Sequence, residues 1–106
     1  MTSKYALAYH PHVTDVFDAL GAEARRLILD ELAERDGQAL YELCARLTMK
    51  HGLTLTRQAI SQHLDVLEAV GLVRSAREGR YKFHYIETGP LEEAVRRWGK
   101  TTKEGR

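Results

Sequence analysis

Apolar residues recur at helical spacing through the first half of the chain. They predict a short helix over residues 14–20, for which Thr14 is a suitable N-cap because its hydroxyl can accept a bond from a free backbone N–H. Gly21 separates this helix from a second one, whose apolar residues are spaced by four positions. We expect the second helix to end at Asp36-Gly37, since glycine readily adopts the left-handed conformation that terminates helices.

Two further helices follow, and a short turn joins them. The third has an apolar stripe at the spacing i, i+3, i+4, i+7 and ends at Gly52. The fourth spans residues 56–70, keeps its apolar residues on one side and ends at Gly71. The stripe of the third helix consists of Leu40, Leu43, Cys44 and Leu47, and that of the fourth of Ile60, Leu64 and Leu67. Two helices joined by a short turn that contains glycine are the outline of a helix-turn-helix.

The pattern changes after residue 72. Over residues 81–86 aromatic side chains alternate with other types, which is the period of a strand. We expect two strands, residues 72–78 and 80–86, joined at Gly79, and then a last helix that begins at Gly89-Pro90 and runs to about residue 100. The predicted fold is therefore mainly α with a small β-hairpin, in the order α-α-α-α-β-β-α, which is a winged helix-turn-helix.

Size and composition fit one small domain. The chain has 106 residues, and 43% of them are hydrophobic, which is enough for a single core. We expect this domain to span residues 13–100, between an N-terminal arm (1–12) and a C-terminal tail (101–106). With 16 basic and 15 acidic residues, total charge does not indicate a nucleic-acid partner, so that argument must be local. The single cysteine, Cys44, cannot form an internal disulfide.

One side of the fourth helix is polar and holds no acid before Asp65. The candidate DNA-contacting residues at its start are Thr56, Arg57, Gln58, Ser61, Gln62 and His63. Arginine and glutamine can make paired hydrogen bonds to guanine and adenine in the major groove, where a carboxylate would repel the phosphates. The alternative is the ordinary solvated side of an amphipathic helix. For His63 two roles stay open, namely contact with a DNA phosphate or packing at the junction of helix and hairpin.

The predicted hairpin is rich in cations. Its candidate DNA-contacting residues are Arg77, Arg80 and Lys82. Together with Arg74 they stand against a single acid, Glu78, and a tight basic turn can reach phosphates beside the groove that the helix enters. Residues 54–85 contain five Lys or Arg and three Asp or Glu, whereas residues 1–53 contain six and eight, so the positive excess lies in the expected DNA-contacting half. The alternative is that the charges protect an edge hairpin against strand addition.

Several of these segments resemble a known family. The pattern Ser-x-His-Leu-x-x-Leu-x-x-x-Gly-Leu-Val over residues 61–73, followed by Arg77-Glu78-Gly79-Arg80-Tyr81, resembles the recognition helix and wing of the ArsR/SmtB repressors. Residues 17–29 are similar to the first two helices of that family, so the resemblance covers about residues 13–99. It implies a dimeric repressor that binds an inverted-repeat operator and releases it when an inducer or signal arrives.

The metal-sensing chemistry of that family is not expected here. Members that sense metals or arsenicals often carry a Glu-Leu-Cys-x-Cys motif in the third helix, where this chain has Glu42-Leu43-Cys44-Ala45-Arg46. One thiolate beside a cation is a poor start for a soft-metal site, and residues 91–100 contain no histidine. We therefore expect no metal and no cofactor. Cys44 is interpreted as a small hydrophobic residue of the apolar stripe, with a redox role as the alternative.

Apolar stripes on the first and last helices exceed what one small core needs. Exposed stripes of this size usually mark an interface, so we expect a homodimer through its terminal helices. The predicted interface residues are Val13, Val16, Phe17, Leu20, Leu91, Val95 and Trp98. A two-fold axis there would place two recognition helices on one face, about one DNA turn apart. The alternative is that both stripes close onto the core of the monomer.

Two other classes of function are rivals to a DNA-binding repressor. A winged helix can serve protein contacts alone, and such a module would tolerate acids on the polar side of the fourth helix. An enzyme is not expected, because no nucleophile, base and carboxylate grouping stands out and the domain has little room for a pocket. With no apolar segment long enough to span a bilayer, we expect a cytoplasmic protein whose partners are double-stranded DNA and a second copy of itself. The sequence identifies no small-molecule inducer.

Overall fold

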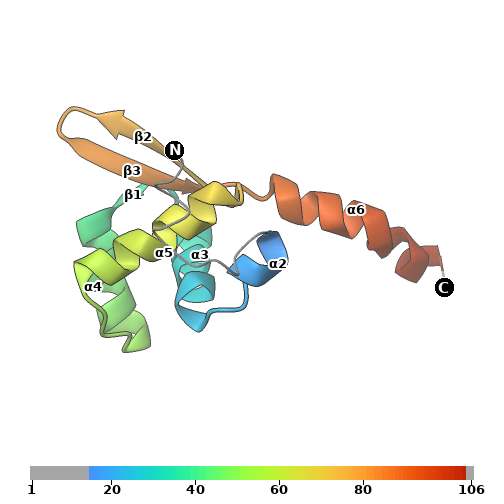
Figure 1. Ribbon diagram of the computed structural model, residues 1–106, viewed down its shortest axis with the longest axis horizontal. Helices are drawn as coiled ribbons and strands as arrows, with labels where there is room; N and C mark the ends of the chain where they lie inside the picture. Colours follow the sequence, from blue (N-terminus) through green and yellow to red (C-terminus); the bar gives the residue numbers. More distant parts are fainter. Residues whose placement is uncertain (1–14, 105–106) are drawn as a thin grey trace.

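The computed structural model describes the backbone of residues 15–104 and the side chains of residues 15–99 (Figure 1). Its elements are α2 (Val16–Ala19), α3 (Glu23–Glu34), β1 (Gln38–Ala39), α4 (Leu40–His51), α5 (Arg57–Ala69), β2 (Val73–Glu78), β3 (Tyr81–Ile86) and α6 (Gly89–Glu104). The predicted winged helix-turn-helix is confirmed, and within residues 15–104 four helices precede the hairpin and one follows it. One strand, β1, is additional.

The core lies between α3, α4 and α5, which all contact one another. Its largest side chains are almost completely buried and come from the predicted apolar stripes: Ile28, Leu32, Leu43, Leu47, Ile60 and Leu67. Leu72 and Val73 extend the core to the start of the hairpin. These stripes hold α5 with its polar side toward solvent, so the core determines which face of the fourth predicted helix is available to a partner.

The helix ends follow the expected signals with one correction. The side chain that caps α2 is Asp15, whose carboxylate accepts a bond from the backbone N–H of Asp18 at 3.0 Å, whereas the predicted cap Thr14 lies outside the described residues. Gly52 ends α4 in the left-handed conformation, with φ 66°. The Thr56 hydroxyl accepts a bond from the N–H of Ala59 at 3.0 Å and so begins α5.

The sheet has three strands in the order β1-β3-β2, not the two that were predicted. β1 pairs antiparallel with β3, with Gln38 opposite His84 and Ala39 opposite Phe83. Two residues are too short to show an alternating pattern, so β1 carries no sequence signal of its own. The wing is the hairpin of β2 and β3, and its turn consists of Gly79 and Arg80. Arg80, expected in a strand, therefore lies in the turn.

The last helix, α6, extends away from the helical body (Figure 1). It reaches Glu104, so residues 101–104, which were expected to form a tail, continue the helix. The first part of α6 approaches the rest of the described chain, where Leu91 packs against the core and Trp98 contacts Phe17 of α2. Most of α6 therefore presents its sides to solvent or to another molecule.

Candidate nucleic-acid interface

The polar side of α5 lies at the surface. Ile60, Leu64 and Leu67 are buried, as predicted, and fix the orientation of the helix. The predicted DNA-contacting side chains on the opposite side are exposed or, for Ser61, half-buried: Arg57, Gln58, Ser61 and Gln62. None of them is packed inside the described part of the protein. The helix also has no acidic residue in its first turn, as the sequence indicated.

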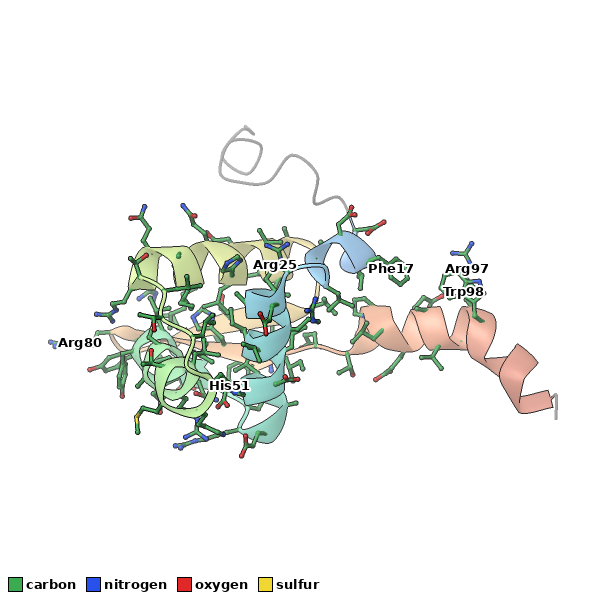
Figure 2. The ribbon with its side chains drawn as sticks, turned by 90° about the horizontal axis from the view of Figure 1, so that it is seen from below. Phe17, Arg25, His51, Arg80, Arg97 and Trp98 are labelled. Carbon is green, nitrogen blue, oxygen red and sulfur yellow. The ribbon has the colours of Figure 1, made fainter. Side chains whose placement is uncertain are left out.

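The wing places the second group of predicted residues beside this helix. Arg77, Arg80 and Lys82 are all exposed, and Arg80 lies at the tip of the hairpin (Figure 2). Arg77 and Lys82 are direct partners across the two strands, so their side chains leave the sheet on the same face. The fourth arginine of the hairpin, Arg74, has a different role, because it binds Glu87 at 2.6 Å and lies over the ring of Tyr85.

A groove of about 300 Å³ lies between α5, the predicted recognition helix, and the wing. Its walls come from the beginning of α4, one side of α5 and the hairpin. The lining residues are Ala39, Leu40, Tyr41, Arg57, Ser61, Leu64, Asp65, Arg77, Arg80, Tyr81, Lys82 and His84. The structure thus brings Arg57 and Ser61 together with the wing cations, whereas Gln58 and Gln62 lie outside the groove on the same helix.

The cations of this groove differ from the other described cations because they have no side-chain partners. Among the residues with described side chains, Arg57, Arg77, Arg80 and Lys82 form no ion pair or hydrogen bond with another side chain. The other described cations have partners. Arg35, Arg46, Lys50, Arg74 and Arg96 bind carboxylates, Arg25 and Arg26 bind backbone carbonyls, and Arg97 lies over Trp98. Four uncompensated positive charges therefore gather at one surface, where they favour an anionic partner.

The side chain of His63 contacts α3. Its Nδ1 accepts a bond from Nη1 of Arg25 at 3.2 Å, since a guanidinium can only donate. Arg25 is 6% exposed, and its Nε donates to the carbonyl of Ala19 at 2.7 Å. The sequence left open packing at the junction of helix and hairpin or contact with a DNA phosphate, and the packing contact described here is instead with Arg25 of α3. Figure 2 shows Arg25 between α2 and α5.

His84 is a feature that the sequence did not single out. It is 6% exposed, and its Nδ1 has no hydrogen-bond partner among the described residues. Burial lowers the pKa of His84 and Lys82 lowers it further, against opposing effects of Glu68 and Asp65. The imidazole is therefore neutral near pH 7. The alternation of β3 gave the only signal, because it placed His84 on the opposite side of the strand from Tyr81 and Phe83.

Comparison with known proteins agrees with this geometry. A family model described as a helix-turn-helix domain matches residues 10–76. The chain is 51% identical over 83 residues to an uncharacterized HTH-type transcriptional regulator of Bacillus subtilis, YuzN, covering 78% of this chain and 90% of that relative. An ArsR-like transcriptional regulator from Rhodococcus sp. RHA1 is 33% identical, with a TM-score of 0.67, over 87% of this chain and 80% of that structure. The chain belongs to the ArsR family of helix-turn-helix transcriptional regulators.

A second solved relative of this ArsR-family regulator is a homodimeric winged helix-turn-helix DNA-binding domain from Mycobacterium bovis. It is 25% identical and has a TM-score of 0.62, with coverage of 100% of this chain and 93% of that structure. Membership in a family of DNA-binding transcriptional regulators confirms the prediction that the protein is not an enzyme. It also confirms the resemblance seen in the recognition helix and wing.

In this ArsR-family chain, Arg46 occupies the position that would hold the second cysteine of a thiolate pair. Its Nε donates to Glu31 at 2.8 Å, so a cation engaged in an ion pair replaces that thiol. Across the described residues, no three His, Cys, Asp or Glu side chains are grouped so that they could hold a metal ion. Cys44 is half-buried against the core, and burial raises the pKa of its thiol despite the nearby charge of Arg57. A protonated thiol is a poor nucleophile, which fits the interpretation of Cys44 as a packing residue.

The residues of the two apolar stripes on the terminal helices divide into a half-buried group and an exposed group. Val16, Leu20 and Leu91 are half-buried against the core, as the monomer interpretation expects, and Val13 lies outside the described residues. Phe17, Val95 and Trp98 remain 56%, 66% and 53% exposed. The rings of Phe17 and Trp98 contact each other, with 6.1 Å between their centroids, so α2 and α6 form one apolar surface (Figure 2).

Searching the described helices for a stretch with the length and apolar character of a membrane span finds none. Besides His84, sequence reasoning missed Tyr41, which lines the groove from α4; Arg25, which supports His63; and Glu31, which is 1% exposed and lies among basic side chains of α4. Each depends on contacts between residues distant in sequence, and a helical pattern does not reveal such contacts.

Proposed function

We propose that this ArsR-family regulator represses transcription by binding an inverted-repeat operator as a homodimer, with α5 in the major groove and the wing on the adjacent backbone. The observation that carries the proposal is the group of unpaired cations, Arg57, Arg77, Arg80 and Lys82, around one groove. Neutralisation of DNA phosphates by such cations releases counterions and supplies much of the affinity for a duplex.

Reading of the base sequence falls to the exposed side of α5. Gln58 and Gln62 are one helical turn apart and exposed, so both can face the floor of a major groove. A glutamine amide can bond to N6 and N7 of adenine at once. Ser61 and Arg57 flank them, whereas the Thr56 hydroxyl is occupied as the cap of α5. We therefore place most base contacts on the two glutamines.

The dimer in this proposal forms through the surface of Phe17, Val95 and Trp98. Large exposed apolar groups seldom gather on a monomer without a partner, and the homodimeric domain from Mycobacterium bovis supports a second copy as that partner. Two-fold symmetry presents two copies of α5 to one face of the duplex. A signal that separates or rotates the copies would release the operator.

Selection of bound fragments from a random DNA library tests this function first, and repeating it with and without Zn(II) tests whether the metal affects release. The proposal expects an enriched palindromic sequence, because a two-fold dimer reads two equivalent half-sites. A protein-interaction module would enrich no sequence and would show little salt-dependent binding. In cells, deletion of the gene should raise transcription from promoters that carry the selected sequence, whereas a fall would indicate an activator.

Variants separate base contacts from phosphate contacts on the selected duplex. Gln58→Ala should cost about 1–3 kcal/mol of discrimination against mismatched duplexes. Arg80→Ala should weaken binding to matched and random duplexes alike and reduce the slope of log K against log salt by roughly one unit for each phosphate that is no longer neutralised. Fluorescence anisotropy at several salt concentrations measures both quantities.

Arg35→Ala is the matched control, because Arg35 is an exposed arginine that contacts Glu42 and does not line the groove. Its salt slope should equal that of the unmodified protein. Equal losses from Gln58→Ala and Arg80→Ala on both kinds of duplex would contradict the assignment of roles, and so would a reduced slope in the control.

A further inference from the structure

An exposed pair of tyrosines lines the groove between α5 and the wing. Tyr41 comes from the first turn of α4 and Tyr81 from the first residue of β3. Their ring centroids are 5.9 Å apart, and the rings are 54% and 49% exposed. Tyr81 also contacts Phe83, at 6.3 Å. Packing of the rings on one another limits their rotamers, so the two phenols lose little conformational freedom when they bind a partner.

The charges around the tyrosines favour an anion in the same groove. Arg77 and Lys82 face each other directly across the hairpin, an arrangement of like charges that is unfavourable without a counter-charge between them. Arg57 lines the same groove from α5. Asp65 is the one carboxylate among the lining residues.

The position of the groove identifies which anion it meets. If α5 enters the major groove and the wing reaches the neighbouring minor groove, the DNA strand between those grooves must pass the space that separates the two elements. Apolar lining is also present, from Ala39, Leu40 and Leu64, and suits the deoxyribose of such a strand. Phenol hydroxyls and arginines are frequent donors to phosphate oxygens.

We propose that this groove seats one phosphodiester of the operator per subunit and that Tyr41 and Tyr81 are positioning residues whose hydroxyls donate to it. Arg57 contacts the same phosphate from α5 and is assigned to the backbone rather than to a base edge. α4 thereby becomes a third DNA-contacting element beside the recognition helix and the wing. This inference rests on the proposed function, since it assumes that α5 and the wing straddle one strand.

Tyrosine-to-phenylalanine variants test the inference because they remove only the hydroxyl. On the selected duplex, Tyr41→Phe and Tyr81→Phe should each reduce affinity about tenfold, as expected when a hydrogen bond to a charged group is removed. The salt slope should stay unchanged, since no charge is removed, whereas Arg57→Ala should reduce it. Tyr85→Phe is the matched control, because Tyr85 lies on the same strand and does not line the groove. Thermal unfolding of each variant checks that the fold is retained.

A scan with neutral methylphosphonate linkages locates the contact on the DNA. At one position per half-site, the neutral linkage should cost less affinity in Tyr41→Phe than in the unmodified protein, because part of the interaction at that phosphate is already missing. Losses that add at every position would overturn the inference, as would tyrosine variants that bind like the unmodified protein. If the unmodified protein bound no duplex at all, the proposed function itself would fail, which is a distinguishable result.

Discussion

Glu31→Gln is expected to lower the free energy of unfolding by about 3 kcal/mol at neutral pH. Glu31 is 1% exposed and is surrounded by three basic side chains, with Arg46 Nε at 2.8 Å, His51 Nε2 at 3.0 Å and Lys50 Nζ at 3.1 Å. Burial alone raises the pKa of Glu31, but these hydrogen bonds outweigh burial and lower it from 4.5 to about 2. The charged carboxylate is thus strongly favoured in the folded protein.

The dependence on pH follows from the direction of that shift. Because the folded pKa lies below the unfolded one, the stabilisation is fully present above about pH 4.5 and is lost as the pH falls toward 2. Glu31→Gln should remove this contribution, so the difference in stability between the two proteins should shrink through that window. Urea unfolding at fixed protein concentration, over a series of pH values, measures it.

Glu34→Gln is the control for this experiment. Glu34 is on the same helix and also binds Lys50, but its side chain is 60% exposed. Exposed pairs of this kind contribute roughly 0–1 kcal/mol, so the control should unfold almost like the unmodified protein. A loss equal to that of Glu31→Gln would show that burial of Glu31 is not what makes the cluster stabilising.

Val95→Glu is expected to convert the dimer to a monomer. Val95 is 66% exposed on α6, so a glutamate there is tolerated by an isolated chain, whereas burial of the carboxylate between two copies would be strongly unfavourable. Affinity for the full operator should fall by about 10²-fold or more, because the second half-site no longer binds through a linked subunit. Analytical ultracentrifugation measures the mass, and anisotropy measures the affinity.

Met49→Glu makes the same chemical change at a different exposed site. Met49 is 81% exposed and lies near the end of α4, away from α6, so this variant should keep the mass of the dimer. If Val95→Glu also sedimented as a dimer, the proposed interface would be wrong.

The helices and the wing were predictable because each has a local signal. The apolar stripe that contains Ile60 and Leu64 oriented α5 correctly, and Gly52 and Gly79 marked turns that the structure confirms. β1 was not predictable, since its two residues are a strand only by pairing with β3. Glu31 gave no signal either, because a helical pattern treats an acid on α3 as a surface residue and cannot show the bases that α4 brings to it.

For the candidate DNA interface, the sequence indicated the residues better than it indicated their arrangement. The cations of the wing and the polar residues of α5 stand out in the sequence because acids are scarce around them. That the groove groups Arg57 with the wing, and leaves Gln58 and Gln62 outside, depends on how α4, α5 and the hairpin pack. Tyr41 joins this group only through that packing, since it lies in a different element and has no motif of its own.

Arg25 links α2, which carries part of the proposed dimer surface, to α5, the proposed DNA-contacting helix. One guanidinium reaches both the end of α2, through Ala19, and the middle of α5, through His63. Because Arg25 is buried, we expect it to influence the tilt of α5 from inside its own subunit, without a contact of its own to the operator or the second copy. Sequence changes around this buried arginine offer a way to tune which half-site spacing a regulator of this kind accepts, while its contact surfaces stay the same.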